Sequence, residues 1–500
     1  MEKGQKVKLI IQDMSNEGQG IGRVEGMAVF VKGAIPGDTV IAEITKVKKN
    51  YAFAVTCEIE EPSEYRIDTQ CEYAGKCGGC LYSGVSYEGQ LAIKENQVRE
   101  KLTRLGGLQN PKLNPIVGMN SPYNYRNKAQ MPISTGGIIT RKGGIVENLG
   151  ECTIGFYKAK SHDVIDCKEC LLQSTPVGAV AQAVRGFMRS DNITAYDPKW
   201  EKGLMRHLIV KTAHGTGEVM VILVINGKGI PNSAKLVEML DDAIYNLPPR
   251  EDGVEYNLES VVVNINKEKT SEIMGKECIT IAGKPTILES VGDMEFEVSP
   301  LAFYQVNPEQ MKVLYDKVLD YADLSGDEYV LDLYCGVGSI GLYCANDMKK
   351  KTAGNGKGKV LGIESVKSAV LDANRNAVIN GLVNAEFIYG RVEEVLASIV
   401  DKEEWEASPL KEKVSAIAKG PISPNVVILD PPRAGCDIAT LEAVSKASPD
   451  KIVYVSCDPA TLARDIKVLS DLGYEFVEGT PVDMFPWTGH VEAIIMMTRA

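Results

Sequence analysis

The 500-residue sequence has no apolar run that approaches the ~18 residues of a membrane-spanning helix. Its first residues, MEKGQKVKLI, lack the apolar core and the small-residue cleavage site of a signal peptide. Internal repeats and low-complexity tracts are also absent. We therefore expect a cytoplasmic protein that does not associate with membranes, and nothing in the pattern indicates an obligate protein partner.

Positive charge is scarce, because 55 Lys and Arg face 67 Asp and Glu and the net charge is −12. This balance argues against a protein that coats nucleic acid non-specifically. Residues 121–214 differ, with 13 basic against 8 acidic residues. That stretch would suit phosphate groups of a nucleic acid, although an ordinary fluctuation of surface charge explains it as well.

The length predicts several domains, because one domain usually holds ~100 to 200 residues. Residues 1–61 contain short apolar stretches separated by Gly-rich turns such as GQGIG, which is typical of a small OB-like β-barrel. Residues 62–295 predict a mixed α/β central domain, in which an amphipathic helix at 88–105 is expected to pack on the C-terminal domain. In residues 296–500, apolar strands alternate with helices, as in a Rossmann-like doubly wound sheet.

In a reducing compartment, the twelve cysteines are buried apolar residues, metal ligands or nucleophiles rather than a disulfide framework. Three of them form CxxxxxCxxC within CEYAGKCGGC, namely Cys71, Cys77 and Cys80. Zinc sites and iron-sulfur clusters both take four thiolates, so a fourth ligand is expected among Cys152, Cys167 and Cys170. The last two form a second CxxC, which keeps zinc open beside an iron-sulfur cluster, and free loop thiols are the third interpretation.

A glycine-rich turn follows an apolar strand in YVLDLYCGVGSIGLYC, the kind of place where α/β sheets bind nucleotides. The next strand ends in Glu364, whose carboxylate would accept both hydroxyls of an adenosine ribose. Sites for NAD and for S-adenosylmethionine both need this arrangement, so a dinucleotide oxidoreductase and a methyltransferase remain open. A third strand ends in Asp430 within DPPR, and its prolines predict a rigid turn at the edge where substrate enters.

Cys457 ends the strand KIVYVSC directly before Asp458 and Pro459, which predict the start of a helix. A helix dipole favours a thiolate there, so Cys457 is a candidate nucleophile, with a buried apolar cysteine as the alternative. In a seven-stranded methyltransferase sheet the last strand is antiparallel, which would bring Glu492 to Cys457 and Asp430 as a general base. A thiolate, a base and a methyl donor together predict methylation of pyrimidine carbon 5, on a base that has left its stack in structured RNA.

The assembled motifs resemble the bacterial RNA uracil-5-methyltransferases along nearly the whole chain. The barrel at 1–61 is similar to a TRAM domain, CxxxxxCxxC is similar to the family's [4Fe-4S] motif, and FYQVN at 303–307, DLYCG, DPPR, SCDPATLARD and HVE follow in the family's order. The resemblance implies an S-adenosylmethionine-dependent enzyme with an RNA-binding barrel, an iron-sulfur cluster and a seven-stranded catalytic domain. It also implies 23S ribosomal RNA as the substrate, with tRNA as the close alternative.

The resemblance further implies roles for single residues. Cys457 corresponds to the nucleophile and Glu492 to the base that removes the carbon-5 proton. The implied contacts to S-adenosylmethionine are Gln305, Tyr334, Glu364 and Asp430. The implied cluster ligands are Cys71, Cys77, Cys80 and Cys170, and Phe303 would contact the flipped base. A dinucleotide oxidoreductase and a non-catalytic RNA-binding protein with a zinc site are the interpretations from other functional classes.

Overall fold

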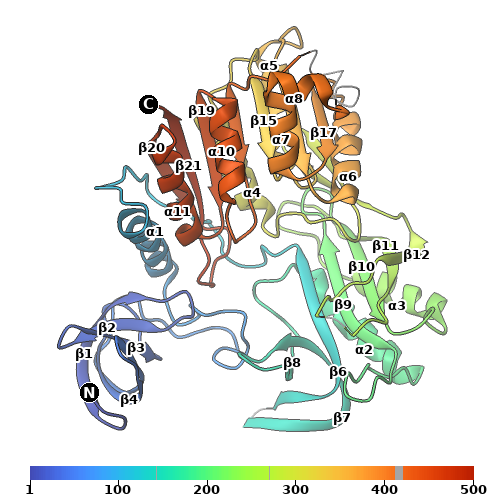
Figure 1. Cartoon of the computed structure of the whole chain (residues 1–500). Helices are drawn as coiled ribbons and strands as arrows, with labels where there is room; N and C mark the ends of the chain where they lie inside the picture. The colour runs from blue at the N-terminus through green and yellow to red at the C-terminus, as the bar shows by residue number, and fades with distance from the viewer. Residues whose placement is uncertain (142–143, 270, 411–419) are drawn as a thin grey trace.

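The computed structural model describes residues 1–141, 144–269, 271–410 and 420–500. The chain forms an N-terminal barrel, a central sheet with two helices against it, and a C-terminal sheet flanked by helices (Figure 1). Within these described ranges, no helix combines the length and the apolar character needed to cross a membrane.

The N-terminal part is a closed barrel with the strand order β1-β2-β3-β5-β4. Its strands are β1 (Lys6–Met14), β2 (Gly20–Val24), β3 (Met27–Lys32), β4 (Thr39–Val47) and β5 (Tyr51–Glu61). The predicted barrel is confirmed, but Gly20 and Gly22 of GQGIG lie within β2 rather than in a turn. A Cβ atom at these glycines would lie 2.7 and 2.6 Å from backbone carbonyl oxygens, so the close approach of neighbouring backbone requires glycine there.

Helix α1 (Tyr87–Arg104) lies between the barrel and the C-terminal part (Figure 1). Val98 and Leu102 are fully buried in the same hydrophobic core as the C-terminal sheet. Further along the chain, Leu113 and Val117 pair with β20 (Tyr474–Val482) through isolated bridges. The helix and the segment after it therefore pack on the C-terminal part, although the rest of the central region follows them in sequence.

The central region folds into a sheet with the order β12-β11-β10-β9-β6-β7-β8. Its strands are β6 (Lys128–Arg141), β7 (Gly144–Tyr157), β8 (Val164–Asp166), β9 (Met205–Thr212), β10 (Glu218–Ile225), β11 (Asn257–Ile265) and β12 (Glu277–Gly283). Helices α2 (Pro176–Ser190) and α3 (Ser233–Tyr245) bury their apolar faces in one core with β9 and β10. A hairpin of β13 (Ile287–Val291) and β14 (Met294–Val298) leads into the C-terminal part.

The C-terminal sheet has the order β17-β16-β15-β18-β19-β21-β20, and all pairings are parallel except those of β21. Its other strands are β15 (Tyr329–Leu333), β16 (Lys359–Glu364), β17 (Ala385–Tyr389), β18 (Val426–Leu429), β19 (Lys451–Ser456) and β21 (Glu492–Arg499). The helices are α4 (Pro308–Ala322), α5 (Ser339–Lys351), α6 (Lys367–Ile379), α7 (Val392–Val400), α8 (Lys402–Ala407), α10 (Ile438–Ala447) and α11 (Pro459–Asp471).

This sheet confirms the predicted Rossmann-like, seven-stranded fold class. Strand order reverses between β15 and β18, and ligands of open α/β sheets bind at such a switch point, beyond the carboxyl ends of the strands. The antiparallel β21 starts at that same edge, because its neighbour β19 ends there. The domain limits at 61 and 295 stay predictions.

Candidate active site

The turn after β15 is shaped for close approach of a ligand to the backbone. Tyr334, Gly336 and Gly338 all have positive φ angles, of 64°, 56° and 78°. A Cβ atom at Gly338 would lie 2.7 Å from the ring of Phe387, so glycine is needed there for packing as well as for conformation. The turn leads into the start of α5, where α/β proteins hold nucleotide ligands.

Glu364 ends β16 beside this turn, and hydrogen bonds fix its carboxylate. Its Oε2 atom accepts the backbone N–H of Gly336 at 3.0 Å, and its Oε1 atom accepts that of Val366 at 2.7 Å. The carboxylate therefore links the glycine turn to the next loop. This is the position from which an acidic side chain contacts ribose hydroxyls in nucleotide-binding α/β folds.

Two further carboxyl groups lie at the same edge. Burial raises the pKa of Asp332 to about 8, opposed by the Gly341 N–H that its Oδ2 accepts at 2.8 Å. Burial raises the pKa of Asp430, at the end of β18, to about 7. Tyr334 is half-buried, and its hydroxyl lies 3.2 Å from Thr440 Oγ1 on α10. A cationic ligand at this edge would favour the charged forms of the two aspartates.

Cys457 lies in the turn from β19 to α11 and Glu492 is the first residue of β21. Ser456 pairs with Ala493 in the antiparallel ladder, so the next position on each strand brings Cys457 opposite Glu492. Glu492 raises the pKa of Cys457, and Asp430 and Arg433 act on the pKa values of both groups. The structure thus brings together the residues that the sequence suggested as nucleophile and base.

Burial opposes the expected activation of Cys457 by the helix dipole. Burial and the nearby Glu492 raise the pKa of Cys457 to about 11, while Arg433 opposes the rise. Asp458 caps the N-terminus of α11, because its carboxylate accepts the backbone N–H of Ala460 at 2.8 Å. Desolvation therefore favours the protonated thiol.

Glu492 is also uncharged near neutrality. Only 6% of the residue is exposed, and burial raises its pKa to about 8, with a further rise from Asp430. Arg433 lowers the pKa again. A carboxyl group with a pKa close to the working pH suits proton transfer in either direction.

Gln305 and Phe303 lie on the segment before α4, which the central region supports. Gln305 is half-buried and Phe303 is 66% exposed. Asn127, just before β6, donates from Nδ2 to the Gln305 carbonyl at 3.0 Å. Lys211 of β9 donates from Nζ to the carbonyls of Ser299 and Ala302, at 2.8 and 2.9 Å.

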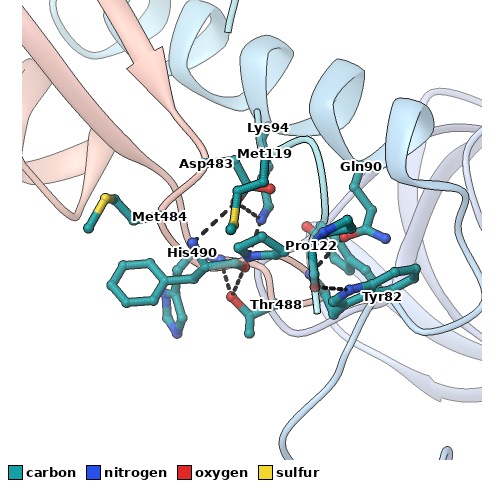
Figure 2. A network of polar contacts seen from close by, with 12 residues as sticks. Tyr82, Gln90, Lys94, Met119, Pro122, Asp483, Met484, Thr488 and His490 are labelled. Carbon is teal, nitrogen blue, oxygen red and sulfur yellow. Dashed lines mark hydrogen bonds and ion pairs between the residues drawn. The ribbon is translucent and has the colours of Figure 1, made fainter. Parts of the chain in front are cut away.

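Sequence reasoning missed these supports, since nothing local marks Asn127 or Lys211 as partners of a segment about 90 to 180 residues away. It also missed the network of Figure 2, in which α1 and the loop before β21 are joined by buried polar contacts. Lys94 and Gln90 of α1 reach Asp483 and Trp487 of that loop, at 2.6 and 2.8 Å. Residues of α1, remote in sequence, therefore position the loop that leads to Glu492 at the start of β21.

The predicted cluster ligands gather beside α1. Cys71, Cys80 and Cys170 line one pocket, and Cys77 packs with Cys71 and Cys170 in a small apolar cluster. Cys167 also lies in that cluster, and its thiol donates to the Glu169 carbonyl at 3.2 Å. Over the part of the chain that the structure describes, no three His, Cys, Asp or Glu side chains have the spacing to hold a metal ion.

The remaining candidate ligand, Cys152, lies elsewhere. Its sulfur is 3.5 Å from the sulfur of Met188 on α2, and both belong to the central core.

The backbone N–H of Gly79 points at the Cys77 sulfur at 3.4 Å. Burial raises the pKa of Cys170, and the N–H groups of Leu172 and Gln173 oppose that rise.

Comparison with known proteins gives a consistent result. Residues 284–500 match the family model described as tRNA (Uracil-5-)-methyltransferase, and residues 1–56 match the TRAM domain. A protein of Caldanaerobacter subterraneus subsp. tengcongensis, named as an RNA methyltransferase, is 42% identical over 99% of this chain and 98% of its own length. A Bacillus cereus protein with the same kind of name is 39% identical over 100% of this chain and 98% of its own.

A solved structure resembles the chain over almost its full length. It is that of the Pyrococcus abyssi tRNA (uracil-54, C5)-methyltransferase in complex with S-adenosyl-L-homocysteine. The TM-score is 0.69 at 25% identity, and the match covers 98% of this chain and 100% of that one. These matches decide between the two interpretations of the glycine-rich turn in favour of a methyltransferase.

Proposed function

Because the chain belongs to the S-adenosylmethionine-dependent RNA (uracil-5-)-methyltransferase family, we propose that it methylates carbon 5 of a uridine in 23S ribosomal RNA. The observation that carries this proposal is the pairing of Cys457 with Glu492 at the edge where the glycine turn also lies. The barrel and the cysteine motif favour ribosomal RNA by their resemblance to the bacterial enzymes. The similarity to an archaeal enzyme named for tRNA makes tRNA the second candidate.

In the proposed mechanism, the Cys457 thiolate adds to carbon 6 of the uracil ring. The new S–C6 bond turns the ring into an enolate, and carbon 5 becomes nucleophilic. S-adenosylmethionine supplies the methyl group when it is bound. Glu492 then takes the proton from carbon 5, and the electron pair left behind restores the C5–C6 double bond and expels the Cys457 thiolate.

The protonation states of Cys457 and Glu492 determine which proton transfers the proposed reaction requires. Burial raises the pKa of Cys457 to about 11 and that of Glu492 to about 8, and both shifts favour the protonated forms. The thiol proton has to leave when the base binds, and the carboxyl group has to lose its proton before it acts as a base. Arg433 lowers the pKa of both groups and therefore favours the reactive forms.

For the methyl donor, we propose contacts through Glu364, Gln305, Tyr334 and Asp430. The Glu364 carboxylate is held by Gly336 and would accept the ribose hydroxyls. The segment with Gln305 is supported through its backbone, because Asn127 donates to the Gln305 carbonyl. Asp430 lies between the glycine turn and Cys457, since β18 is flanked by β15 and β19.

We also propose a [4Fe-4S] cluster held by Cys71, Cys77, Cys80 and Cys170. Four thiols that share one small region, with an N–H donor at the Cys77 sulfur, fit the sulfur ligands and N–H···S contacts of such clusters. When bound, the cluster would link the 71–80 segment covalently to residue 170.

Two measurements test the function. Purified protein should form a covalent complex with RNA that contains 5-fluorouridine, because fluorine at carbon 5 cannot be removed as a proton. Mass mapping of 5-methyluridine in cells that lack the protein should show its loss at one or more 23S positions. Loss confined to tRNA would support the second candidate, and absence of both the complex and any methylation by purified enzyme would contradict the proposed reaction.

A further inference from the structure

A pocket lies beside Cys457 where three parts of the chain meet. The barrel contributes the turn between β1 and β2, helix α1 contributes its last turns, and the C-terminal part contributes the loops after β18 and before β21. The lining residues outside α11 and its capping turn include Asn16, Gln97, Lys101, Arg433, Gly489 and His490.

Specific contacts fix the geometry of this junction. A Cβ atom at Gly489 would lie 2.6 Å from the carbonyl oxygen of Asn16, so glycine lets the barrel turn approach the catalytic loop. Gln97 is buried and donates from Nε2 to the carbonyl of Met14 at 3.0 Å and to the hydroxyl of Tyr82 at 2.9 Å. These contacts hold the barrel against α1 beside the pocket.

Lys101 follows Gln97 by four residues, so both side chains lie on the same face of α1. The other cations of the helix have acidic partners: Lys94 pairs with Asp483, Arg99 with Glu95 and Arg104 with Glu100. For Lys101, by contrast, the described residues supply no acidic partner or hydrogen bond for the ammonium group. It is an exposed cation at the rim of the Cys457 pocket.

The charge around Lys101 favours an anion. Arg433 is exposed on the same pocket, and the carboxylate of Asp458 is engaged by the N–H groups of Ala460 and Thr461. Glu492 and Asp430 act on Cys457 from the sheet edge, and Glu492 is buried. A chain with a net charge of −12 thus presents a basic rim at this place.

We propose that Lys101 binds a backbone phosphate of the RNA next to the extruded uridine, with Asn16 and His490 lining the same phosphate subsite. The inference rests on the proposed function, because it takes Cys457 as the place where the base is held. A base that leaves its stack rotates about its own backbone, so a phosphate adjacent to it comes to the mouth of the pocket. A cation there holds the extruded conformation without reading the sequence.

The matched control is Arg104 on the same helix. Lys101 and Arg104 both lie in the last turn of α1, where a cation interacts favourably with the helix dipole. Arg104 pairs with Glu100, its side chain is 70% exposed, and it does not line the pocket. Replacing either residue by Ala removes one positive charge at the helix end, and Arg104→Ala also removes the exposed pair with Glu100. A greater loss of RNA affinity for Lys101→Ala than for Arg104→Ala therefore reports the phosphate contact.

The experiment uses full-length protein and the shortest RNA fragment that the wild-type enzyme methylates. Lys101→Ala should weaken RNA affinity about tenfold and reduce the slope of log affinity against log salt by about 1. Lys101→Arg should retain most of the affinity, and Arg104→Ala should retain both affinity and slope. Binding of S-adenosylmethionine and the melting temperature should match those of Arg104→Ala.

Chemically altered RNA identifies the phosphate. Fragments with a single uncharged methylphosphonate on the 5′ or the 3′ side of the target uridine are compared with unmodified RNA. For the wild type, one of the two should weaken binding about as much as Lys101→Ala does, and the same linkage should have no further effect on that variant. Three outcomes would overturn the phosphate subsite. The losses of affinity from Lys101→Ala and from the methylphosphonate could be additive, the Lys101 and Arg104 variants could lose affinity equally, or neither methylphosphonate could weaken binding by the wild type. RNA that is bound but never methylated would instead contradict the proposed function, and the affinity comparison would still decide on Lys101.

Discussion

The ammonium group of Lys94 lies 2.6 Å from Asp483 Oδ1, and both side chains are fully buried (Figure 2). Lys94 also donates to the carbonyl of Phe485 at 3.0 Å. Asp483 follows β20 directly, and the loop that it opens continues to Glu492. The pair therefore ties helix α1, far upstream in sequence, to the loop that delivers the proposed base.

We expect Lys94→Met to lower the free energy of unfolding by about 3–5 kcal/mol, because it leaves the buried Asp483 carboxylate without its cation. Urea unfolding of the purified variant measures this loss. The double variant Lys94→Met/Asp483→Leu should recover part of it, since no unpaired charge remains buried. Glu100→Ala breaks an exposed pair on the same helix and should cost less than ~1 kcal/mol. If Lys94→Met and Glu100→Ala lowered the free energy of unfolding equally, this account of the buried pair would be contradicted.

Cys457→Ala should abolish both methylation and the covalent complex with 5-fluorouridine RNA, because no other thiol lies across from Glu492 in the described sheet. RNA binding and S-adenosylmethionine binding should persist. Cys57→Ala, at an exposed position of β5, is the control and should behave as the wild type. Measurable turnover by Cys457→Ala would refute the assignment of the nucleophile.

Much of the fold could be predicted from the sequence because its signals are local. Apolar strands that alternate with helices indicated the C-terminal sheet, and short apolar stretches indicated the barrel, although Gly20 and Gly22 lie in β2 rather than in a turn. The meeting of Cys457 and Glu492 followed from one topological rule, namely that the last strand runs antiparallel and starts where its neighbour ends.

The remaining features depend on burial and on long-range packing, which a local pattern does not reveal. The sequence indicates a helix start beside Cys457, but the raised pKa of that thiol comes from desolvation by the assembled fold. Lys94 and Asp483 are 389 residues apart, and each looks like an ordinary surface residue in the sequence. Lys101 lines the Cys457 pocket because α1 packs on the C-terminal core, and Asn16 lines it because Gln97 holds the barrel against α1.

Glu492→Gln should allow addition to carbon 6 and methyl transfer but stall before release, so that a methylated covalent RNA adduct accumulates. Gel shift and mass spectrometry of the adduct measure this. Glu475→Gln, on the exposed side of β20, should turn over as the wild type. A Glu492→Gln variant that releases product at the normal rate would exclude Glu492 as the base.

The expected pH profile of the reaction follows from the raised pKa values of Glu492 and Cys457. Burial raises the pKa of Glu492 to about 8, and a base acts only in its deprotonated form, so kcat/KM for RNA should rise as the pH increases from 6 to 8. The Cys457 thiolate contributes in the same direction, because its pKa is about 11. A profile that falls over this range would mean that neither group has to lose a proton in the free enzyme.

The cysteines allow a test that separates ligands from neighbours. Cys170→Ser should lower iron and acid-labile sulfide in the purified protein and weaken its visible absorption, because a proposed cluster ligand is lost. Cys152→Ser should retain both, since its sulfur packs on Met188 in a different core. Cys167→Ser is the discriminating variant, because this thiol lies in the same small cluster but donates to the Glu169 carbonyl. Cys167→Ser should keep its iron. Loss of iron from this variant but not from Cys170→Ser would identify Cys167, rather than Cys170, as the fourth cluster ligand.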